Sequence, residues 1–293
     1  MKIAIYGRIL PDPLPARLQV LFDELKKINA ELYLHKDYAA YIAETFTIEC
    51  PIDTHSDYDS IRGKADYLLS IGGDGTLLET ISFVRNSGIP ILGINTGRLG
   101  FLAFVSADEE IRAAIKSLTK RKFILDKRTL LKITKPADLF GDVNFALNEL
   151  TIQRKDSSAM MTIHTYVDGV LLNSYWADGL IIATPTGSTA YSLSCGGPLM
   201  VPEAKIFSIT PLAPHNLNVR PLVVPDDSTI TLRVEGRNAQ YLASLDSRTK
   251  AFDVGVELTV QKEDFKISLV RSPDQHFFNT IRNKLMWGLD QRN

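Results

Sequence analysis

Hydrophobic positions in the first third of the chain alternate between two patterns. The segment from Lys2 to Tyr6 is a short apolar run, which is typical of a strand buried on both faces. Prolines interrupt the chain at positions 11, 13 and 15, and apolar residues then recur at helical spacing at Leu18, Leu21, Phe22 and Leu25. This pattern predicts a strand, a loop and a helix.

A second unit of the same kind follows. Tyr67 to Ile71 is another apolar run, and it is followed by the glycine loop Gly72-Gly73-Asp74-Gly75. A helical pattern comes next, with apolar residues at Leu77, Leu78, Ile81 and Val84. Gly88 and Pro90 end it, and Ile89 to Ile94 supplies a third strand. Helices that alternate with continuous apolar strands predict a parallel sheet covered on both faces.

The remainder of the chain changes in character. Ser106 and Glu109 have the spacing of a capping box, and the amphipathic helix predicted after them ends the first domain. From Phe123 to about Val270 the pattern is mostly strand-like, and Asp168-Gly169 is a hairpin turn signal. The predicted strands are Leu130 to Ile133, Leu150 to Gln153, Met161 to Val167, Leu180 to Ala183, Ile230 to Val234 and Leu258 to Val260.

These patterns predict an α/β plus all-β protein. A doubly wound α/β domain over residues 1–120 is followed by a β-rich domain over 121–274. In the last segment, His276 to Gly288, apolar residues fall on one helical face. We expect this C-terminal helix, within 275–293, to return to the first domain.

The composition is that of a soluble globular protein, with 45% hydrophobic and 23% charged residues among 293. The formal net charge is -1, so no overall positive field attracts nucleic acid or an anionic membrane. No apolar run approaches the roughly 18 residues of a membrane span. We therefore expect neither nucleic acid nor a membrane as a partner.

Cysteine usage and the N-terminus indicate a cytoplasmic protein. The two cysteines, Cys50 and Cys195, are too few for a disulfide framework and lack the paired spacing of zinc ligands. The N-terminal apolar run is short and has no small-residue cleavage site, so it is typical of a first strand rather than a signal peptide.

The glycine loop is the first segment with a chemical signature. Between a buried strand and a helix, backbone N–H groups and the helix dipole favour an anion, and glycines let it approach closely. Asp74 in such a loop is unfavourable unless it accepts a hydroxyl proton or holds a metal ion. The alternative is an ordinary strand-to-helix turn, in which Gly, Asp and Thr are all common.

A second segment rich in hydroxyls, Thr184 to Pro198, follows the strand predicted at Leu180 to Ala183. A nucleotide base could lie against Tyr191, with hydrogen bonds from Thr189 and Ser194. For most of these hydroxyls individually, a helix N-cap and core packing is the competing interpretation. Asp178, just before the strand, is either a polar anchor or a turn residue.

Asn148-Glu149 combines an amide and a carboxylate at the start of a predicted strand. The amide can pair with an adenine edge as donor and acceptor, and the carboxylate can accept both hydroxyls of a ribose. Polarity at a strand end is the simpler alternative.

Other catalytic constellations are absent from the sequence. The five histidines are scattered without metal-ligand spacing, and there is no Gly-x-Ser-x-Gly elbow of a hydrolase. Neither a Walker lysine motif nor a Rossmann glycine motif occurs between a strand and a helix. The glycine loop is therefore another kind of phosphate site.

Together these segments resemble the NAD kinase family. Gly72 to Thr76 is shared with phosphofructokinases and with diacylglycerol and sphingosine kinases, whereas Asn95 to Leu102 is similar to NAD kinases and differs from the Gly-Thr-x-Asn-Asp of lipid kinases. Asn148-Glu149, Asp178-Gly179 and the segment Thr184 to Pro198 follow in family order. The resemblance covers most of the chain, from about Leu68 to Ser247.

The resemblance implies transfer of the terminal phosphoryl group of ATP to the 2′-hydroxyl of the adenosine ribose of NAD, in a cleft between two domains. It implies that Asp74 is the catalytic base, and that Gly72 and Gly73 approach the ATP phosphates with Mg²⁺ or another divalent metal, whose ligands stay unassigned. The substrate-binding residues implied are Gly75, Phe101, Asn148, Glu149, Asp178, Thr189, Ala190, Tyr191, Ser192, Leu193, Ser194 and Ala213.

The resemblance also implies a homodimer or a homotetramer. In one departure from the family pattern, Trp176 stands where many bacterial members have an arginine, so that a contact to the substrate pyrophosphate is missing or comes from another residue. The alternatives to an NAD kinase are a lipid or sugar kinase of the same superfamily, or a module that senses NAD(P) without catalysis.

Overall fold

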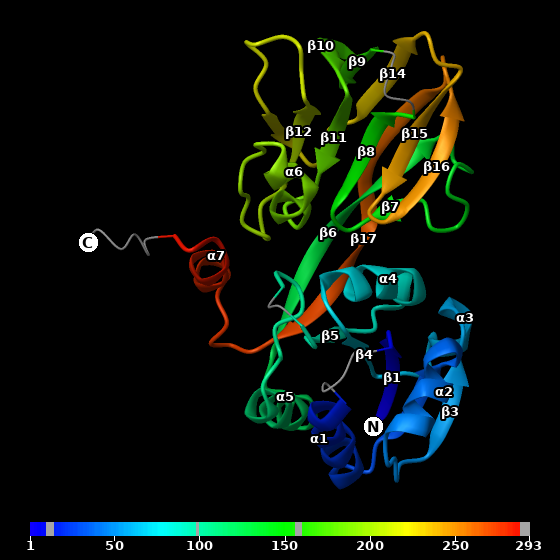
Figure 1. The fold of residues 1–293 in the computed structure, drawn as a ribbon, viewed down its shortest axis with the longest axis vertical. Helices are drawn as coiled ribbons and strands as arrows, with labels where there is room; N and C mark the ends of the chain where they lie inside the picture. Colours follow the sequence, from blue (N-terminus) through cyan, green and yellow to red (C-terminus); the bar gives the residue numbers. More distant parts are fainter. Residues whose placement is uncertain (10–14, 98–99, 156–159, 288–293) are drawn as a thin grey trace. The chain divides into compact units, whose positions relative to one another are not determined.

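The computed structural model describes residues 1–9, 15–97, 100–155 and 160–287. The chain forms two compact units (Figure 1). The first contains Met1–Lys127 together with Ile267–Asn293, and the second contains Arg128–Lys266. The first unit is therefore made from both ends of the chain and the second from its middle.

Five parallel strands form the sheet of the first unit, in the order β5-β4-β1-β2-β3. At Leu269 the end of β17 pairs in parallel with Ile91 of β5. Parallel neighbours need crossover connections, and helices supply them between successive strands. The bounds are β1 (Lys2–Gly7), α1 (Pro15–Lys27), β2 (Glu31–His35), α2 (Lys36–Thr45), β3 (Ile52–His55), α3 (Tyr58–Ile61), β4 (Tyr67–Ile71), α4 (Asp74–Val84), η1 (Arg85–Ser87), β5 (Ile91–Ile94), α5 (Asp108–Lys120) and, at the end of the chain, α7 (Phe277–Leu285).

Two antiparallel sheets form the second unit. One has the order β13-β12-β11-β8-β15-β16, and the other contains β10-β9-β14-β17, with β6 paired to β17 and β7 paired to β6. Two short helical turns, η2 (Gly187–Thr189) and α6 (Tyr191–Ser194), follow β11. The strands are β6 (Ile124–Lys135), β7 (Phe145–Ala146), β8 (Glu149–Arg154), β9 (Met161–Val167), β10 (Val170–Ala177), β11 (Gly179–Ala183), β12 (Ile206–Leu212), β13 (Leu222–Pro225), β14 (Ile230–Gly236), β15 (Gln240–Leu245), β16 (Arg248–Asp253) and β17 (Glu257–Arg271).

Each unit has its own apolar core. In the first, Ile3 and Ile5 of β1 pack in one cluster with Leu21 and Leu25 of α1. In the second, a single cluster takes side chains from both sheets, which is the packing of a β-sandwich. Its members include Leu150, Ile182 and Phe207 from one sheet and Ile163 and Leu232 from the other.

The predicted fold class is confirmed, with an α/β part first, a β-rich part after it and a terminal helix in the first unit. The strands predicted at Tyr67 to Ile71 and Met161 to Val167 have the same limits as β4 and β9. Asp168 and Gly169 form the hairpin turn with φ values of 51° and 80°. Gly288, at the end of the predicted C-terminal helix, lies outside the described residues.

The predicted cap of α5 was wrong by one residue. The helix begins at Asp108, and Glu110, rather than Glu109, occupies the third helical position. Its Oε2 accepts from the backbone N–H of Ser106 (2.7 Å) and of Ala107 (3.0 Å) and from the Ser106 hydroxyl (3.1 Å). The first helical residue lies one position later than a cap at Ser106 would place it.

The limits expected for the domains, 1–120, 121–274 and 275–293, stay a prediction. The compact units divide between Lys127 and Arg128 and between Lys266 and Ile267, inside the strands β6 and β17. The hydrophobic pattern of a strand does not change where the strand passes from one unit to the other. The sequence therefore gives no signal for these two boundaries.

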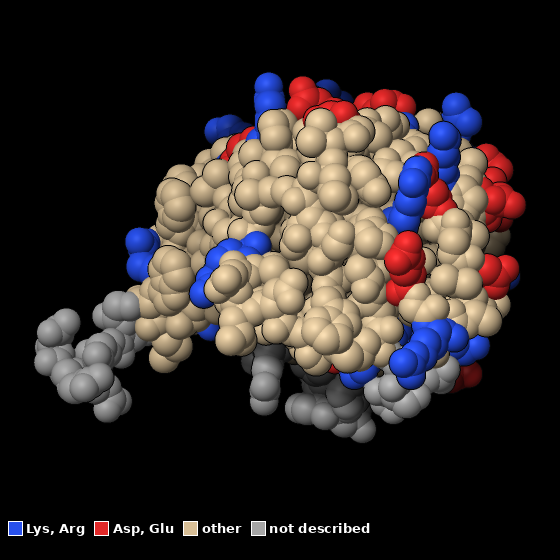
Figure 2. Space-filling model, turned by 90° about the horizontal axis from the view of Figure 1, so that it is seen from above, with Lys and Arg blue, Asp and Glu red and all other residues tan. Residues whose placement is uncertain are grey.

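Figure 2 shows positive and negative groups toward the edge of the face drawn, and uncharged residues in its centre. This face therefore carries no continuous positive surface. None of the helices that the structure describes is long and apolar enough to cross a membrane. Cys50 and Cys195 are both free thiols.

Two histidines lie in the core of the first unit, His35 at the end of β2 and His55 at the end of β3. Their ring centroids are 5.2 Å apart, and both rings contact Phe83. His55 Nε2 is 3.2 Å from the carbonyl oxygen of Ile5. Burial lowers the pKa of His55 from 6.5 to about 4, so the folded protein keeps this imidazole neutral.

We expect the free energy of unfolding to fall as the pH decreases from about 6.5 to about 4. In this range the unfolded chain protonates His55 and the folded chain does not, a difference on the order of 3 kcal/mol. His55→Gln, which keeps an amide donor for Ile5, should flatten this part of the profile in denaturant titrations. His276→Gln, at an exposed histidine, is the control. Equal slopes for the wild type and His55→Gln would contradict the prediction.

Candidate active site

The glycine loop lies between the end of β4 and the start of α4. The N–H of Gly72 donates to the carbonyl of Ile94 at 2.9 Å, which ties the loop to β5. A Cβ at Gly72 would lie 2.3 Å from Oγ1 of Thr76, whereas at Gly73 and Gly75 it would meet no atom within 4 Å. Bare backbone at the N-terminus of an eleven-residue helix is typical of a phosphate-binding loop.

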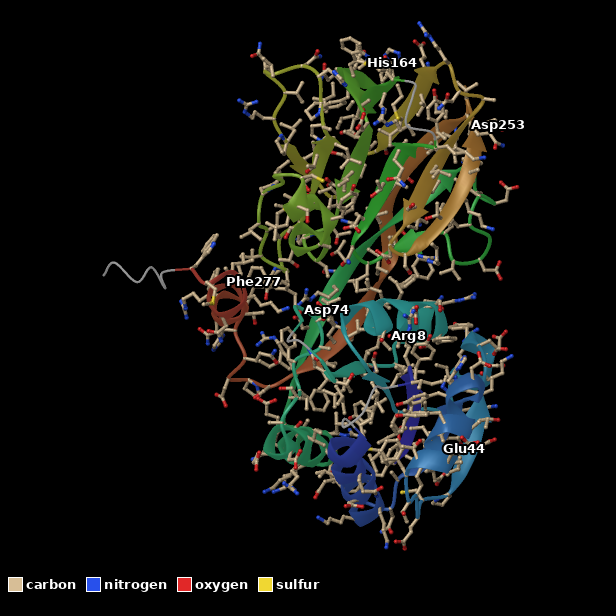
Figure 3. All side chains as sticks on the ribbon, in the orientation of Figure 1. Arg8, Glu44, Asp74, His164, Asp253 and Phe277 are labelled. Carbon is tan, nitrogen blue, oxygen red and sulfur yellow. The ribbon has the colours of Figure 1, made fainter. Side chains whose placement is uncertain are left out.

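Asp74 is the first residue of α4, and its half-buried carboxylate accepts three backbone hydrogen bonds. Oδ2 accepts from Phe101 at 2.6 Å, and Oδ1 accepts from Leu102 and Ala103 at 3.1 Å each. A Cβ at Gly100 would lie 1.8 Å from Oδ1, so this residue must be glycine for the contact to form. The carboxylate is thus held in one orientation, at the start of the helix (Figure 3).

Asn95 holds the other side of the same segment. Its Oδ1 accepts from the N–H of Gly97 at 2.7 Å, and its Nδ2 donates to the carbonyl of Ala103 at 3.2 Å. Beyond Ala103 the chain returns to β5, where Val105 forms a parallel bridge with Ile94. Arg98 and Leu99, in the middle of the predicted family motif, lie outside the described residues.

In the second unit, strand pairing brings together segments that are far apart in the sequence. Ala183 at the end of β11 pairs with Glu149 at the start of β8, and Leu150 pairs with Leu245 at the end of β15. The turn Asp246-Ser247, the dipeptide Asn148-Glu149 and the loop after β11 therefore lie at one end of the six-stranded sheet.

Asp246 is the centre of this end of the sheet. Asp246 is half-buried, and its carboxylate accepts from the N–H of Leu147 at 3.0 Å, of Asn148 at 2.8 Å and of Glu149 at 3.3 Å. Arg248 lies nearby and donates to the carbonyl oxygens of two residues before this segment, Val143 and Phe145. The carboxylate of Asp246 in this turn thus holds the backbone of Asn148-Glu149 in place.

Glu149 is only 8% exposed, and the N–H of Tyr191 donates to its carboxyl. Within the described part of the chain, its Oε2 has no hydrogen-bond partner. Burial, and secondly the charge of Asp246, raise the pKa of Glu149 to about 8. At pH 7 this carboxyl is mostly protonated, so it can donate one hydrogen bond as well as accept others.

The loop after β11 packs closely on Asn148. The Thr184 N–H donates to the carbonyl of Asn148 at 2.9 Å. A Cβ at Gly187 would lie 2.1 Å from the same carbonyl oxygen, so only glycine fits there. Buried Arg128 donates to Oγ1 of Thr186 at 3.3 Å. These contacts fix the loop before the predicted nucleotide-binding residues.

Those residues, Thr189 to Ser194, form the end of η2 and the helical turn α6. The ring of Tyr191 is 45% exposed, and Ser194 is exposed as well. In contrast, Ser192 is fully buried and its hydroxyl lies 3.0 Å from that of Thr210, so it faces the interior. Thr189 donates to the carbonyl of Thr186 at 3.2 Å. Ala190 and Leu193 are half buried.

Asp178 and Ala213 lie at the other end of β11. Their neighbours Gly179 and Leu212 are paired, and Ala183 is four residues further along the strand, roughly 13 Å at the usual rise. Asp178 forms an ion pair with Arg154 at 2.9 Å. The structure of this unit therefore does not group Asp178 and Ala213 with Asn148 and Glu149.

Trp176, where the resemblance leads us to expect an arginine, contacts His215. The ring centroids are 5.1 Å apart at an interplanar angle of 39°, and the His215 N–H donates to the Trp176 carbonyl at 2.9 Å. The indole is 46% exposed. An indole has one N–H donor and no positive charge, so it does not replace a guanidinium.

The two groups of residues define the class of the protein. One unit has a loop of bare glycine backbone and a fixed carboxylate at the start of a helix, and the other has a polar, partly buried turn at one end of a sheet. A chain that combines them is a nucleotide-dependent phosphotransferase.

Comparison with known proteins identifies the family. The model of the ATP-NAD kinase N-terminal domain matches residues 17–123, and that of the C-terminal domain matches 147–272. NAD kinases of Cytophaga hutchinsonii and Flavobacterium psychrophilum are 46% and 47% identical to the chain, over the full length of both partners. The chain belongs to the ATP-NAD kinase family.

Solved structures agree with this result. Yeast NADH kinase in complex with NADH has a TM-score of 0.87 and 26% identity, over 99% of this chain and 88% of that one. An NAD kinase from Archaeoglobus fulgidus in complex with ATP has a TM-score of 0.76 and 25% identity, over 98% of this chain and 99% of that one.

No role was predicted for Asp246 or Arg128 from the sequence. Asp246 has a positive φ of 52°, and a polar residue tolerant of this conformation between two strand-like runs is a turn signal. That signal predicts the turn, but not the three N–H groups that reach its carboxylate from about a hundred residues away.

Asp246→Asn tests the role of this carboxylate. The amide nitrogen of Asn would face one of three N–H donors, which costs roughly 1–3 kcal/mol for an unsatisfied buried group. We expect a lower melting temperature and a higher KM for NAD. Ser247→Ala, in the same turn, is the matched control. A variant that melts and binds NAD as the wild type does would refute the role.

Proposed function

We propose that this chain transfers the terminal phosphoryl group of ATP to the 2′-hydroxyl of the adenosine ribose of NAD, giving NADP and ADP. The observation that carries the mechanism is the fixed carboxylate of Asp74 at the start of α4, within a loop of bare glycine backbone. The whole-length NAD kinase relatives favour this acceptor over a lipid or a sugar.

Asp74 is proposed as the general base. A carboxylate has about four acceptor positions, and three accept the N–H groups of residues 101–103, which leaves room for a hydroxyl. As the bond between the 2′-oxygen and the γ-phosphorus forms, the bond from that phosphorus to the β,γ-bridging oxygen breaks. The hydroxyl proton passes to Asp74, and ADP leaves.

The glycine loop is proposed to hold ATP. The N–H groups at the start of α4, together with Gly72 and the bare backbone at Gly73, suit an anionic phosphate chain, and Gly75 beside Asp74 is proposed for the substrate. The described residues contain no group of three His, Cys, Asp or Glu side chains that could hold a metal by themselves. A magnesium ion, when bound with ATP, would offset the charge of the phosphates.

The second unit is proposed to bind NAD. The amide of Asn148 suits the adenine edge, and the mostly protonated carboxyl of Glu149 can both donate to and accept from ribose hydroxyls. The exposed ring of Tyr191 offers a face for a base, beside Thr189, Ala190 and Ser194. Asp178 and Ala213 are proposed for the nicotinamide half, and Phe101 of the first unit for the border of the site.

Three further features are proposed: a divalent metal and assembly into a homodimer or homotetramer, from the family resemblance, and a cytoplasmic location, from cysteine usage and the N-terminus. A non-catalytic NAD(P) sensor is the second candidate from another class. A sensor does not need a carboxylate held by three backbone N–H groups within a phosphate loop.

The activity itself is tested with the purified chain, NAD, ATP and magnesium. We expect NADP to form, and we expect its formation to cease when EDTA removes the metal, because the loop has no Walker lysine to offset the phosphate charge. Binding of NAD without any NADP formation would favour the sensor. Full activity after exhaustive removal of metal would refute the magnesium proposal.

Asp74→Asn tests the base. We expect kcat for NADP formation to fall by about 10²–10⁴-fold, as for loss of a general base, with NAD still bound. Because Asn also loses an acceptor for residues 101–103, a matched control is needed. Glu110→Gln provides it, since Glu110 likewise accepts two backbone N–H groups and a hydroxyl at the start of a helix. Turnover of folded Asp74→Asn within a few-fold of Glu110→Gln would exclude the assignment.

A further inference from the structure

Phe101 connects the proposed base with the C-terminal helix α7. Its backbone N–H makes the shortest of the three hydrogen bonds to Asp74, at 2.6 Å. Its ring lies below the ammonium of Lys284 on α7, with Nζ 5.3 Å from the ring centroid. One residue thus contacts the proposed catalytic carboxylate through its backbone and the end of the chain through its side chain.

Phe101 is the least fixed of the three donors to Asp74. The side chains of Leu102 and Ala103 are buried at 5% and 1% exposure, and the Ala103 carbonyl is also held by Asn95. Phe101 is only partly buried. Burial fixes Leu102 and Ala103 in place. The orientation of the Phe101 N–H therefore depends more on the contacts of the Phe101 ring.

The helix α7 is itself held by few contacts. Of its residues, Thr280 and Ile281 are buried. Asn279 and Asn283 line a cavity of about 450 Å³ together with Phe104, Val105 and residues of α5. Phe278 is 61% exposed, and Figure 3 shows Phe277 at the start of this helix. The cation–ring contact of Lys284 is thus a direct link from α7 to Phe101.

We propose that Lys284 is a positioning residue, which holds the Phe101 ring and so directs the Phe101 N–H to the carboxylate of Asp74. The inference rests on the proposed function of Asp74. Its physical basis is the attraction of a cation to the face of an aromatic ring. This attraction remains favourable at a site that is partly exposed to solvent. Lys284 does not touch substrate in this proposal, and it acts on the reaction through Phe101 alone.

Lys284→Met tests the link, because methionine keeps much of the apolar stem and removes the charge. We expect kcat to fall by about two- to fivefold, the effect of one such contact at a partly exposed site, with KM for NAD and ATP unchanged. Lys284→Arg should restore the wild-type kcat, because a guanidinium also binds the ring face. Arg282→Met, at an exposed cation of the same helix whose guanidinium donates to Asn279, is the matched control.

A double-mutant cycle separates this role from direct binding of phosphate by Lys284. In a Phe101→Leu background the ring is absent, so Lys284→Met should cause no further loss of kcat. If the two losses multiply, or if Lys284→Met raises KM for ATP, the lysine acts on the substrate and the proposal is overturned.

Hydrogen exchange supplies a measurement that does not need activity. We expect the amide of Phe101 to exchange faster in Lys284→Met than in the wild type or in Arg282→Met, and the amide of Ala103 to change less. Unchanged exchange at Phe101 would overturn the inference even if the enzyme is active. Absence of NADP formation by the wild type would instead refute the proposed function. The exchange measurement would still test whether Lys284 positions Phe101.

Discussion

The proposed site of the first unit depends on three hydrogen bonds. Consecutive backbone N–H groups of residues 101–103 donate them to the carboxylate of Asp74. Residues 100–103 form no helix or regular strand, so their N–H groups need other partners. Because Asp74 is also the first residue of α4, one side chain connects the helix, the glycine loop and this segment. The group proposed to accept the proton is thus part of the structure that holds it in place.

A second carboxylate has the same role in the other unit. Desolvation of the Asp246 carboxylate is costly for its charged form and raises its pKa, and the N–H groups of three consecutive residues offset part of that cost. Its charge contributes to the raised pKa of Glu149, which stays mostly neutral at pH 7. A neutral Glu149 adds no negative charge where an anionic dinucleotide is proposed to bind.

The hydrophobic pattern predicted the fold class and the parts of the sheets with a strong signal. Strand β4 is buried at every position and is therefore a continuous apolar run, whereas β9 is buried at alternate positions and has an alternating pattern. Both patterns can be recognised in the sequence. Strand β3 was not predicted, because three of its four residues are exposed and carry no such pattern. The cap of α5 was placed one residue too early, because Ser106 and Glu109 have capping spacing but the helix starts later.

The sequence alone determined which residue types are available: an acid among glycines after a buried strand, and an amide, a carboxylate and a run of hydroxyls further on. Each is a local pattern, and the family match depends on such patterns. Only the tertiary structure decided that Asp74 accepts from residues 101–103, that Asp246 supports Asn148, and that Ser192 faces the interior while Tyr191 is exposed. The physical reason is that every residue except proline carries the same backbone N–H. Which N–H groups donate to a carboxylate therefore depends on the path of the chain in three dimensions, and the residue types do not indicate it.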